Sequence, residues 1–171
     1  MMHQSDAASP VLDRRIQSAT IVVAALAFSV VMMAVVGTLV APDANEVPPT
    51  SSLFFVAAAF FAMLGSVIVR RLMLQPARLV QVYGRSGEAG LAEHAFRVTI
   101  ISAALAEAVG AIGLVLGLVT GDTYYMYVLC FIALLGVLSN FPRARRWREL
   151  NAEISMRTQA GAASGSFGTG S

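Results

Sequence analysis

The chain has 171 residues, of which 57% are hydrophobic and only 13% are charged, and its formal net charge is +2. Soluble domains carry about 25% charged residues, so this composition offers too little charge to cover a water-facing surface. The apolar residues also occur in long blocks rather than in alternating or striped patterns. These features exclude an ordinary soluble domain and predict an all-α integral membrane protein.

Four apolar blocks approach the length of about 20 residues that a bilayer core requires. In chain order they cover residues 16–40, 51–69, 98–119 and 123–141. Backbone groups in lipid have to be hydrogen-bonded internally, so each block is predicted to be a transmembrane α-helix. The first block exceeds the apolar part of a signal peptide and no A-x-A cleavage site follows it, so we expect an uncleaved anchor.

The basic residues lie on one side of the predicted spans. All twelve are Arg: two precede residue 16, five lie between residues 70 and 97, and five follow residue 141. The loops at 41–50 and 120–122 contain acidic charges and no basic ones. Because basic loops stay in the cytoplasm, both termini are predicted to be cytoplasmic. We place the four-helix protein in the cytoplasmic (inner) membrane of a bacterium.

Three cytoplasmic segments accompany the transmembrane domain of residues 16–141. Residues 1–15 form an N-terminal segment. Residues 72–96 form a connector in which glycines around Gly87 indicate a turn, and the helical pattern resumes at Leu91. Residues 142–171 begin with a basic run and continue from residue 158 as a tail of small residues, which we expect to be disordered.

The third predicted helix is rich in small residues. Gly113, Gly117 and Gly121 are spaced four apart, and Gly110 lies one turn before them. Small residues let transmembrane helices approach closely. These glycines are therefore predicted to pack against a neighbouring helix or against another copy of the chain.

Glu107 is the only ionisable residue deep within a predicted span. It follows Arg97 by ten residues, or about 15 Å along a helix, which places it near the middle of the bilayer. An ionised carboxylate there costs about 3 kcal/mol or more, so we expect Glu107 to be largely protonated. The hydroxyl groups of Ser29, Ser66 and Ser102 are available as partners, and Ser66 fits best by predicted depth.

The stretch ALAEAVGAIGLVLGLV around Glu107 resembles the ion-binding helix of the c subunit of rotary ATP synthases. The resemblance implies that Glu107 corresponds to the proton-carrying carboxylate, and Gly113, Leu114 and Val115 to the stretch that follows it. The long connector, the phenylalanines within residues 56–66 and the two additional helices depart from that family. Over its whole length the chain is more similar to uncharacterised bacterial four-helix membrane proteins with an E-x5-G-L-V helix, which implies no activity.

Charged residues before the third span offer a weaker site. Glu93 and Arg97 have the i, i+4 spacing of a helix-surface ion pair. Glu93 and the adjacent His94 could pass protons from the cytoplasm towards Glu107. The simpler interpretation is that both residues belong to a helix start exposed to water.

The basic run after the fourth span suggests a lipid contact. It contains Arg143, Arg145, Arg146 and Arg148. Each Arg near an anionic membrane surface contributes about 1 kcal/mol of attraction. The same charges could instead serve only to orient the chain.

No residue pattern typical of an enzyme is present in the sequence. Cys130 is the only cysteine, and no Ser–His–Asp arrangement, cluster of metal ligands or phosphate-binding glycine loop occurs. We therefore predict no catalytic residue, no metal, no cofactor and no nucleic-acid partner.

Two functions are compatible with this sequence. The first is a non-catalytic membrane protein, either a homo-oligomer or an accessory subunit of a larger complex, packed through its Gly/Ala-rich third helix. The alternative is a proton-binding or ion-translocating protein, similar to the c subunit, that uses Glu107. Polar groups or water near Glu107 would favour the alternative.

Overall fold

The computed structural model describes residues 10–40, 49–121 and 123–165, and these residues form five α-helices and no strand. The prediction of an all-α chain is therefore confirmed for the described residues. The helices are α1 (Pro10–Val40), α2 (Pro49–Met73), α3 (Pro76–Thr120), α4 (Thr123–Ser139) and α5 (Ala144–Gly165).

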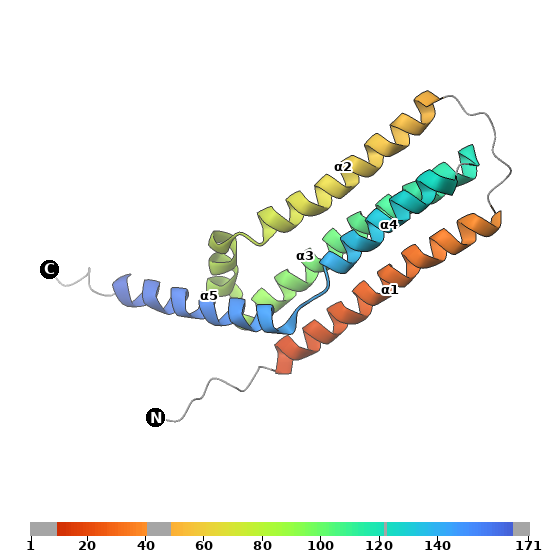
Figure 1. Cartoon of the computed structure of the whole chain (residues 1–171). Coiled ribbons are helices and arrows are strands. Elements are labelled where there is room, and N and C mark those ends of the chain that lie inside the picture. The colour runs from red at the N-terminus through yellow and green to blue at the C-terminus, as the bar shows by residue number, and fades with distance from the viewer. Residues whose placement is uncertain (1–9, 41–48, 122, 166–171) are drawn as a thin grey trace.

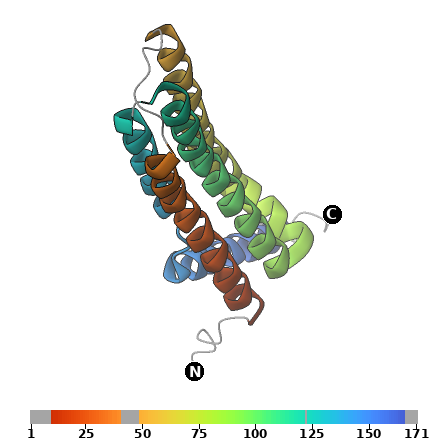
Figure 2. The ribbon, with the colours of Figure 1, turned by 90° about the vertical axis from the view of Figure 1, so that its right-hand side faces the viewer.

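Helices α1 to α4 form an elongated bundle, and α5 crosses one end of it (Figure 1, Figure 2). Helix α3 is central, since it packs against α1, α2 and α4 and also against α5. Helices α1 and α3 run in one direction and α2 and α4 in the other (Figure 1). The start of α1, the end of α2, the first part of α3 and α5 therefore meet at one end. We call it the arginine end, because the twelve arginines of the chain lie at 14–15, 70–97 and 143–157.

Three helical segments are long and apolar enough to cross a membrane, namely Leu12–Val40, Leu53–Met73 and Pro76–Thr120. Helix α4 is also apolar but has 17 residues. At 1.5 Å per residue it is about 26 Å long, slightly less than a hydrocarbon core of about 30 Å. The part of the chain that the structure describes is thus a membrane protein with three long candidate spans and one shorter apolar helix.

The core of the bundle combines small side chains with a few large ones, and many large apolar side chains face outwards. Ala103 and Ala106 of α3 and Ala133 of α4 are fully buried in the core. Phe54 and Phe60 of α2, in contrast, are 73% and 64% exposed. A soluble bundle buries its large apolar side chains, whereas this arrangement suits a surface covered by lipid or by other transmembrane helices.

The connector expected at residues 72–96 is largely helical. Helix α2 continues to Met73, and α3 begins at Pro76 rather than at Leu91. Proline suits a first helical turn because its φ is fixed and its missing N–H is not needed there. Gly87 has φ 62° and ψ −159°, and α3 bends sharply between its first segment and its long segment (Figure 1). Only glycine adopts such a backbone conformation readily.

Helix α5 extends through residues 158–165, within the segment expected to be a disordered tail. An apolar stripe within the preceding basic segment holds α5 on the bundle. Leu150 and Ile154 share a face of α5 and pack with Leu79 and Leu91 of α3, and Ile154 is only 1% exposed. Residues 166–171 lie outside the described residues, as do residues 1–9 of the predicted N-terminal segment.

Candidate functional site

Glu107 lies on α3 at the edge of its packed face. Its side chain is half-buried, and the preceding residue, Ala106, is completely buried. None of the residues that the structure describes forms a hydrogen bond or an ion pair with Glu107. The carboxyl group therefore borders the contact between α3 and its neighbours rather than the centre of the core.

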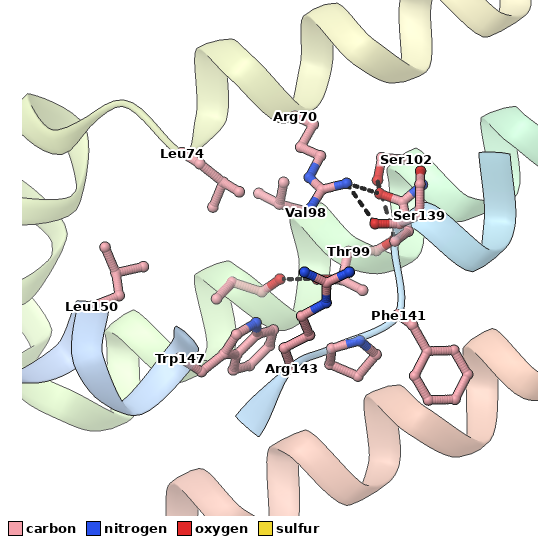
Figure 3. Close-up of a pocket in the computed structure, with 13 residues that line it drawn as sticks. Arg70, Leu74, Val98, Thr99, Ser102, Ser139, Phe141, Arg143, Trp147 and Leu150 are labelled. Atoms are coloured by element: carbon pink, nitrogen blue, oxygen red, sulfur yellow. Dashed lines mark hydrogen bonds between the residues drawn. The ribbon is translucent and has the colours of Figure 1, made fainter. Parts of the chain in front are cut away.

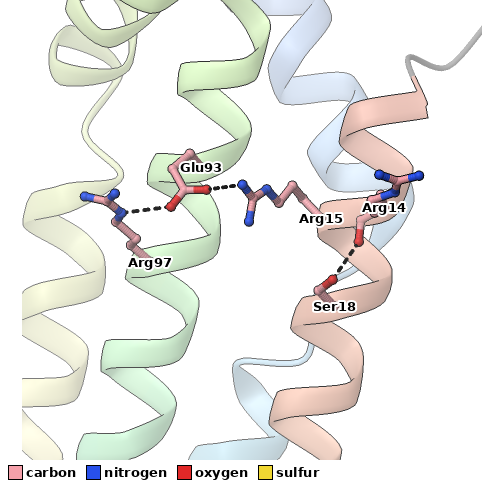
Figure 4. Close-up of polar contacts among 5 residues, drawn as sticks. All are labelled: Arg14, Arg15, Ser18, Glu93 and Arg97. Atoms are coloured by element: carbon pink, nitrogen blue, oxygen red, sulfur yellow. Dashed lines mark hydrogen bonds and ion pairs between the residues drawn. The ribbon is translucent and has the colours of Figure 1, made fainter.

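The contact between α1 and α3 begins with a charged cluster at the arginine end (Figure 4). Arg15 Nη2 of α1 lies 2.8 Å from Glu93 Oε2 of α3, and Arg97 Nε lies 3.0 Å from Glu93 Oε1. The Arg15 guanidinium also lies 5.5 Å from the centre of the Phe96 ring. The predicted pair of Glu93 and Arg97 is present in the structure, and Arg15 joins it from a different helix.

This cluster joins the two parallel helices at one height and indicates which residue of α1 lies level with Glu107. Ser29 follows Arg15 by 14 residues, and Glu107 follows Glu93 by 14 residues. Fourteen residues are close to four helical turns, so Ser29 and Glu107 lie on the same faces of α1 and α3 as Arg15 and Glu93. Ser29, which is half-buried, thus lies at the height of Glu107, although no hydrogen bond joins these two described residues.

The expected relay from Glu93 and His94 is not continuous in the structure. Glu93 lies about 21 Å below Glu107 along α3, because each residue adds 1.5 Å. His94 Nε2 donates a hydrogen bond of 3.0 Å to the carbonyl oxygen of Met73 and so links α3 to the end of α2. Within the described residues, Glu93 and His94 therefore hold helices together at the arginine end.

Ser66, the preferred partner of Glu107 from the sequence, has another hydrogen bond. Its Oγ donates to the carbonyl oxygen of Ser102 at 2.7 Å, in the buried contact of α2 with α3. Ser102 Oγ donates in turn to Asn140 Oδ1, and Asn140 Nδ2 donates to the Gly136 carbonyl oxygen at 2.8 Å. These bonds connect α2, α3 and the end of α4.

Arg70 extends this polar cluster towards the surface. Its Nη1 donates to the Ser139 carbonyl oxygen at 2.8 Å and lies 3.4 Å from Asn140 Oδ1. Sequence reasoning missed Arg70 and Asn140 because both seemed to be ordinary residues at the ends of spans. The signal was the spacing of Ser66 and Arg70, which places both on one face of α2.

The glycines of α3 pack against α4 within the chain. A Cβ atom on Gly113 would lie 2.7 Å from Leu129 Cβ, and one on Gly117 would lie 2.9 Å from Met126 Sδ. Gly110 faces Ala133 of α4 as well as α1. The glycine face is therefore occupied by neighbouring helices of the same copy.

Gly121 has a different role from the packing expected of it. It is the C-cap of α3, with φ 70° in the left-handed region, and its N–H donates to the Gly117 carbonyl oxygen at 2.9 Å. Glycine is favoured at such a position because a side chain there is strained. The residue ends α3 and allows the turn into α4.

The basic run divides into members with different surroundings. Arg145 pairs with Glu149 at 2.8 Å, and Arg148 pairs with Asp13 of α1 at 3.0 Å. Arg143 lines a pocket at the arginine end, and the side chain of Arg146 lies outside the described residues. Of the arginines predicted to contact lipid, Arg145 and Arg148 are thus already paired with acidic residues.

In the described ranges, no group of three or more His, Cys, Asp and Glu side chains is placed to hold a metal ion. We compared the chain with protein-family models, with curated proteins and with solved structures, and none of the three comparisons found a match.

Proposed function

We propose that this chain is a non-catalytic protein of the bacterial cytoplasmic membrane, with four transmembrane helices and both termini in the cytoplasm. Helix α4 supports the fourth span, because it packs along α3 and its 17 residues reach the lower limit for crossing a bilayer. The location of all twelve arginines at one end of the bundle supports the orientation.

A reporter fused after residue 171 tests this topology. Alkaline phosphatase is active only outside the cytoplasm, so we expect an inactive fusion at the C-terminus and an active fusion after residue 45. If α4 did not cross the membrane, the C-terminal fusion would be active.

We further propose that the protein acts as an accessory or self-assembling subunit. The observation that carries this proposal is the outward aromatic face of α2, where Phe54, Phe60 and Phe61 are 73%, 64% and 69% exposed. The glycine face of α3 is occupied by α4, so assembly uses an outer face instead. Helix α2 suits this role because it packs mainly against α3 and has few contacts with α4.

Disulfide cross-linking in membranes tests this assembly. In a Cys130→Ala background, Phe60→Cys is expected to form a cross-linked dimer, or an adduct with a larger partner, when an oxidant is added. Phe131→Cys is the matched control, since it is 61% exposed on α4 and lies away from the proposed contact. Equal cross-linking of both variants, or of neither, contradicts assembly through α2.

The alternative function is proton binding by Glu107, as the resemblance to the c subunit suggests. The seam between α1 and α3 favours it, because the hydroxyl of Ser29 lies at the height of the carboxyl group. Proton flux into vesicles that contain the purified protein tests this alternative. Flux that Glu107→Gln abolishes and Glu107→Asp retains would support it.

A further inference from the structure

A pocket of about 300 Å³ opens at the arginine end between α2, α3, α4 and α5. Its polar lining consists of two arginines, three hydroxyl residues and one amide, with no carboxylate among the thirteen lining residues; these six are Arg70, Thr99, Ser102, Ser139, Asn140 and Arg143. Such a lining combines positive charge with polar groups and contains no carboxylate.

The two arginines reach the pocket from different parts of the chain (Figure 3). Arg70 is held at the end of α2 by its hydrogen bond to the Ser139 carbonyl oxygen at 2.8 Å. Arg143 precedes α5, its side chain is exposed, and it extends over the pocket between Thr99 and Trp147 (Figure 3). No other described residue forms an ion pair or a side-chain hydrogen bond with Arg143.

The start of α5 adds to the positive potential of this pocket. The carbonyl oxygen of Arg143 accepts the backbone hydrogen bond of Trp147 N at 3.1 Å, so the first turn of the helix begins at the pocket. The N-terminal end of a helix carries a partial positive charge, which favours a nearby anion.

A second pocket continues from the first along the membrane-facing groove between α2 and α4. It has a volume of about 400 Å³ and shares Arg70, Leu74, Ser139 and Asn140 with the first pocket. It adds Met63 and Val67 from the preceding turns of α2. Met63 lies about 10 Å above Arg70 along the helix, towards the middle of the bundle.

We propose that this pair of pockets binds one anionic phospholipid. Arg143 and Arg70 contact the phosphate, because guanidinium groups match its geometry and charge. The Thr99 and Ser139 hydroxyls donate to the carbonyl oxygens of Ala95 and Gly136, so their oxygens can accept hydrogen bonds from a headgroup hydroxyl. Trp147 lies at the polar boundary, and one acyl chain follows Met63 and Val67. The apolar side chains of Met63, Val67 and Leu74 beside these polar groups favour a lipid over free phosphate.

This inference rests on the membrane orientation proposed above and is independent of Glu107 and of assembly through α2. It also differs from general attraction between a basic segment and an anionic surface. Under general attraction, the strength of lipid binding depends on the number of arginines. For a pocket, the strength of binding depends on which arginine is replaced.

Native mass spectrometry of the purified protein in detergent tests the pocket, with phosphatidylglycerol as the probe. Arg143→Gln is expected to weaken phosphatidylglycerol binding about tenfold, as expected for the loss of a charge-assisted hydrogen bond. Arg145→Gln is the matched control, because it removes the same charge two residues away, outside the pocket, and should change binding less than about twofold. Arg70→Lys keeps the charge but loses the planar fork, so it should also weaken binding.

Three results would overturn the proposal. Equal losses for Arg143→Gln and Arg145→Gln would show diffuse surface attraction. Phosphatidylcholine, which has a phosphate but no net charge, should bind more weakly, and equal binding would contradict an anionic site. Displacement of the lipid by millimolar inorganic phosphate would assign the pocket to a soluble anion. If the C-terminal phosphatase fusion were active while Arg143→Gln still weakened lipid binding, only the proposed orientation would be contradicted.

Discussion

Gly113 of α3 faces Leu129 of α4 so closely that a Cβ atom on the glycine would lie 2.7 Å from Leu129 Cβ. The same atom would lie 3.3 Å from the carbonyl oxygen of Met126, so the backbones of the two helices are themselves near each other. This contact explains why the glycine-rich helix is the centre of the bundle: the absence of side chains brings α4 against it.

Replacing Gly113 with alanine is expected to lower the free energy of unfolding by about 1–3 kcal/mol, because overpacking forces the helices apart. The measurement is thermal unfolding of the purified protein in detergent. Gly65→Ala on α2 is the matched control, since a Cβ atom there meets nothing within 4 Å. A loss of stability at Gly65 as large as that at Gly113 would contradict the packing argument.

Gly87 is expected to resist substitution for a conformational reason rather than for lack of space. A Cβ atom there would meet nothing within 4 Å, but φ is 62° and ψ is −159°, so Gly87→Ala should cost about 1–3 kcal/mol. Gly84→Ala, also with open space around it, should be neutral or stabilising because alanine favours a helix. Paired unfolding curves compare the two, and equal effects would contradict the bend described at Gly87.

Ser66→Ala removes the hydrogen bond that joins α2 to the Ser102 carbonyl oxygen. Hydrogen bonds between transmembrane helices contribute about 0.6 kcal/mol on average, and we expect a destabilisation of that size. Ser18→Ala is the control, since Ser18 Oγ bonds only to Arg14 of its own helix at 3.0 Å. Unfolding by a denaturing detergent measures both, and an unchanged midpoint for Ser66→Ala would argue against the bond.

Ile154→Ala is expected to loosen α5 from α3, because the side chain is 1% exposed and packs with Leu79 and Leu91. The substitution should cost about 2–5 kcal/mol locally and speed trypsin cleavage at Arg157. Met156→Ala, at a side chain that is 63% exposed, should leave the cleavage rate unchanged. Equal protection of both variants would mean that this contact does not hold α5.

The class of the molecule was predictable from its sequence because lipid imposes simple rules. Long apolar blocks require helices, and the glycines of α3 indicated close packing before the neighbouring helix was known. Helix α5 was not predicted, because its three apolar residues lie among basic and small residues. These apolar residues are Trp147, Leu150 and Ile154. Their spacing indicates one face of a helix, but the sequence alone does not show that this face packs against α3.

The candidate sites were less predictable because they depend on the register between helices. Predicted depth favoured Ser66 over Ser29 as a neighbour of Glu107, because the sequence does not show how the helices are aligned. The ion pair of Arg15 and Glu93 at 2.8 Å shows how α1 and α3 are aligned, and counting 14 residues from each partner places Ser29 level with Glu107. The pocket lined by Arg70 and Arg143 likewise combines residues 73 positions apart in the sequence.

Modification of Glu107 by an apolar carbodiimide in native membranes, measured across pH with Glu107→Gln as the control, tests whether Glu107 exchanges protons. Carbodiimides label protonated carboxyl groups that reagent and protons can reach. A non-catalytic subunit predicts Glu107-dependent labelling that does not change with pH near neutrality. Labelling of Glu107 that increases as the pH falls would contradict this account and establish a titrating acid.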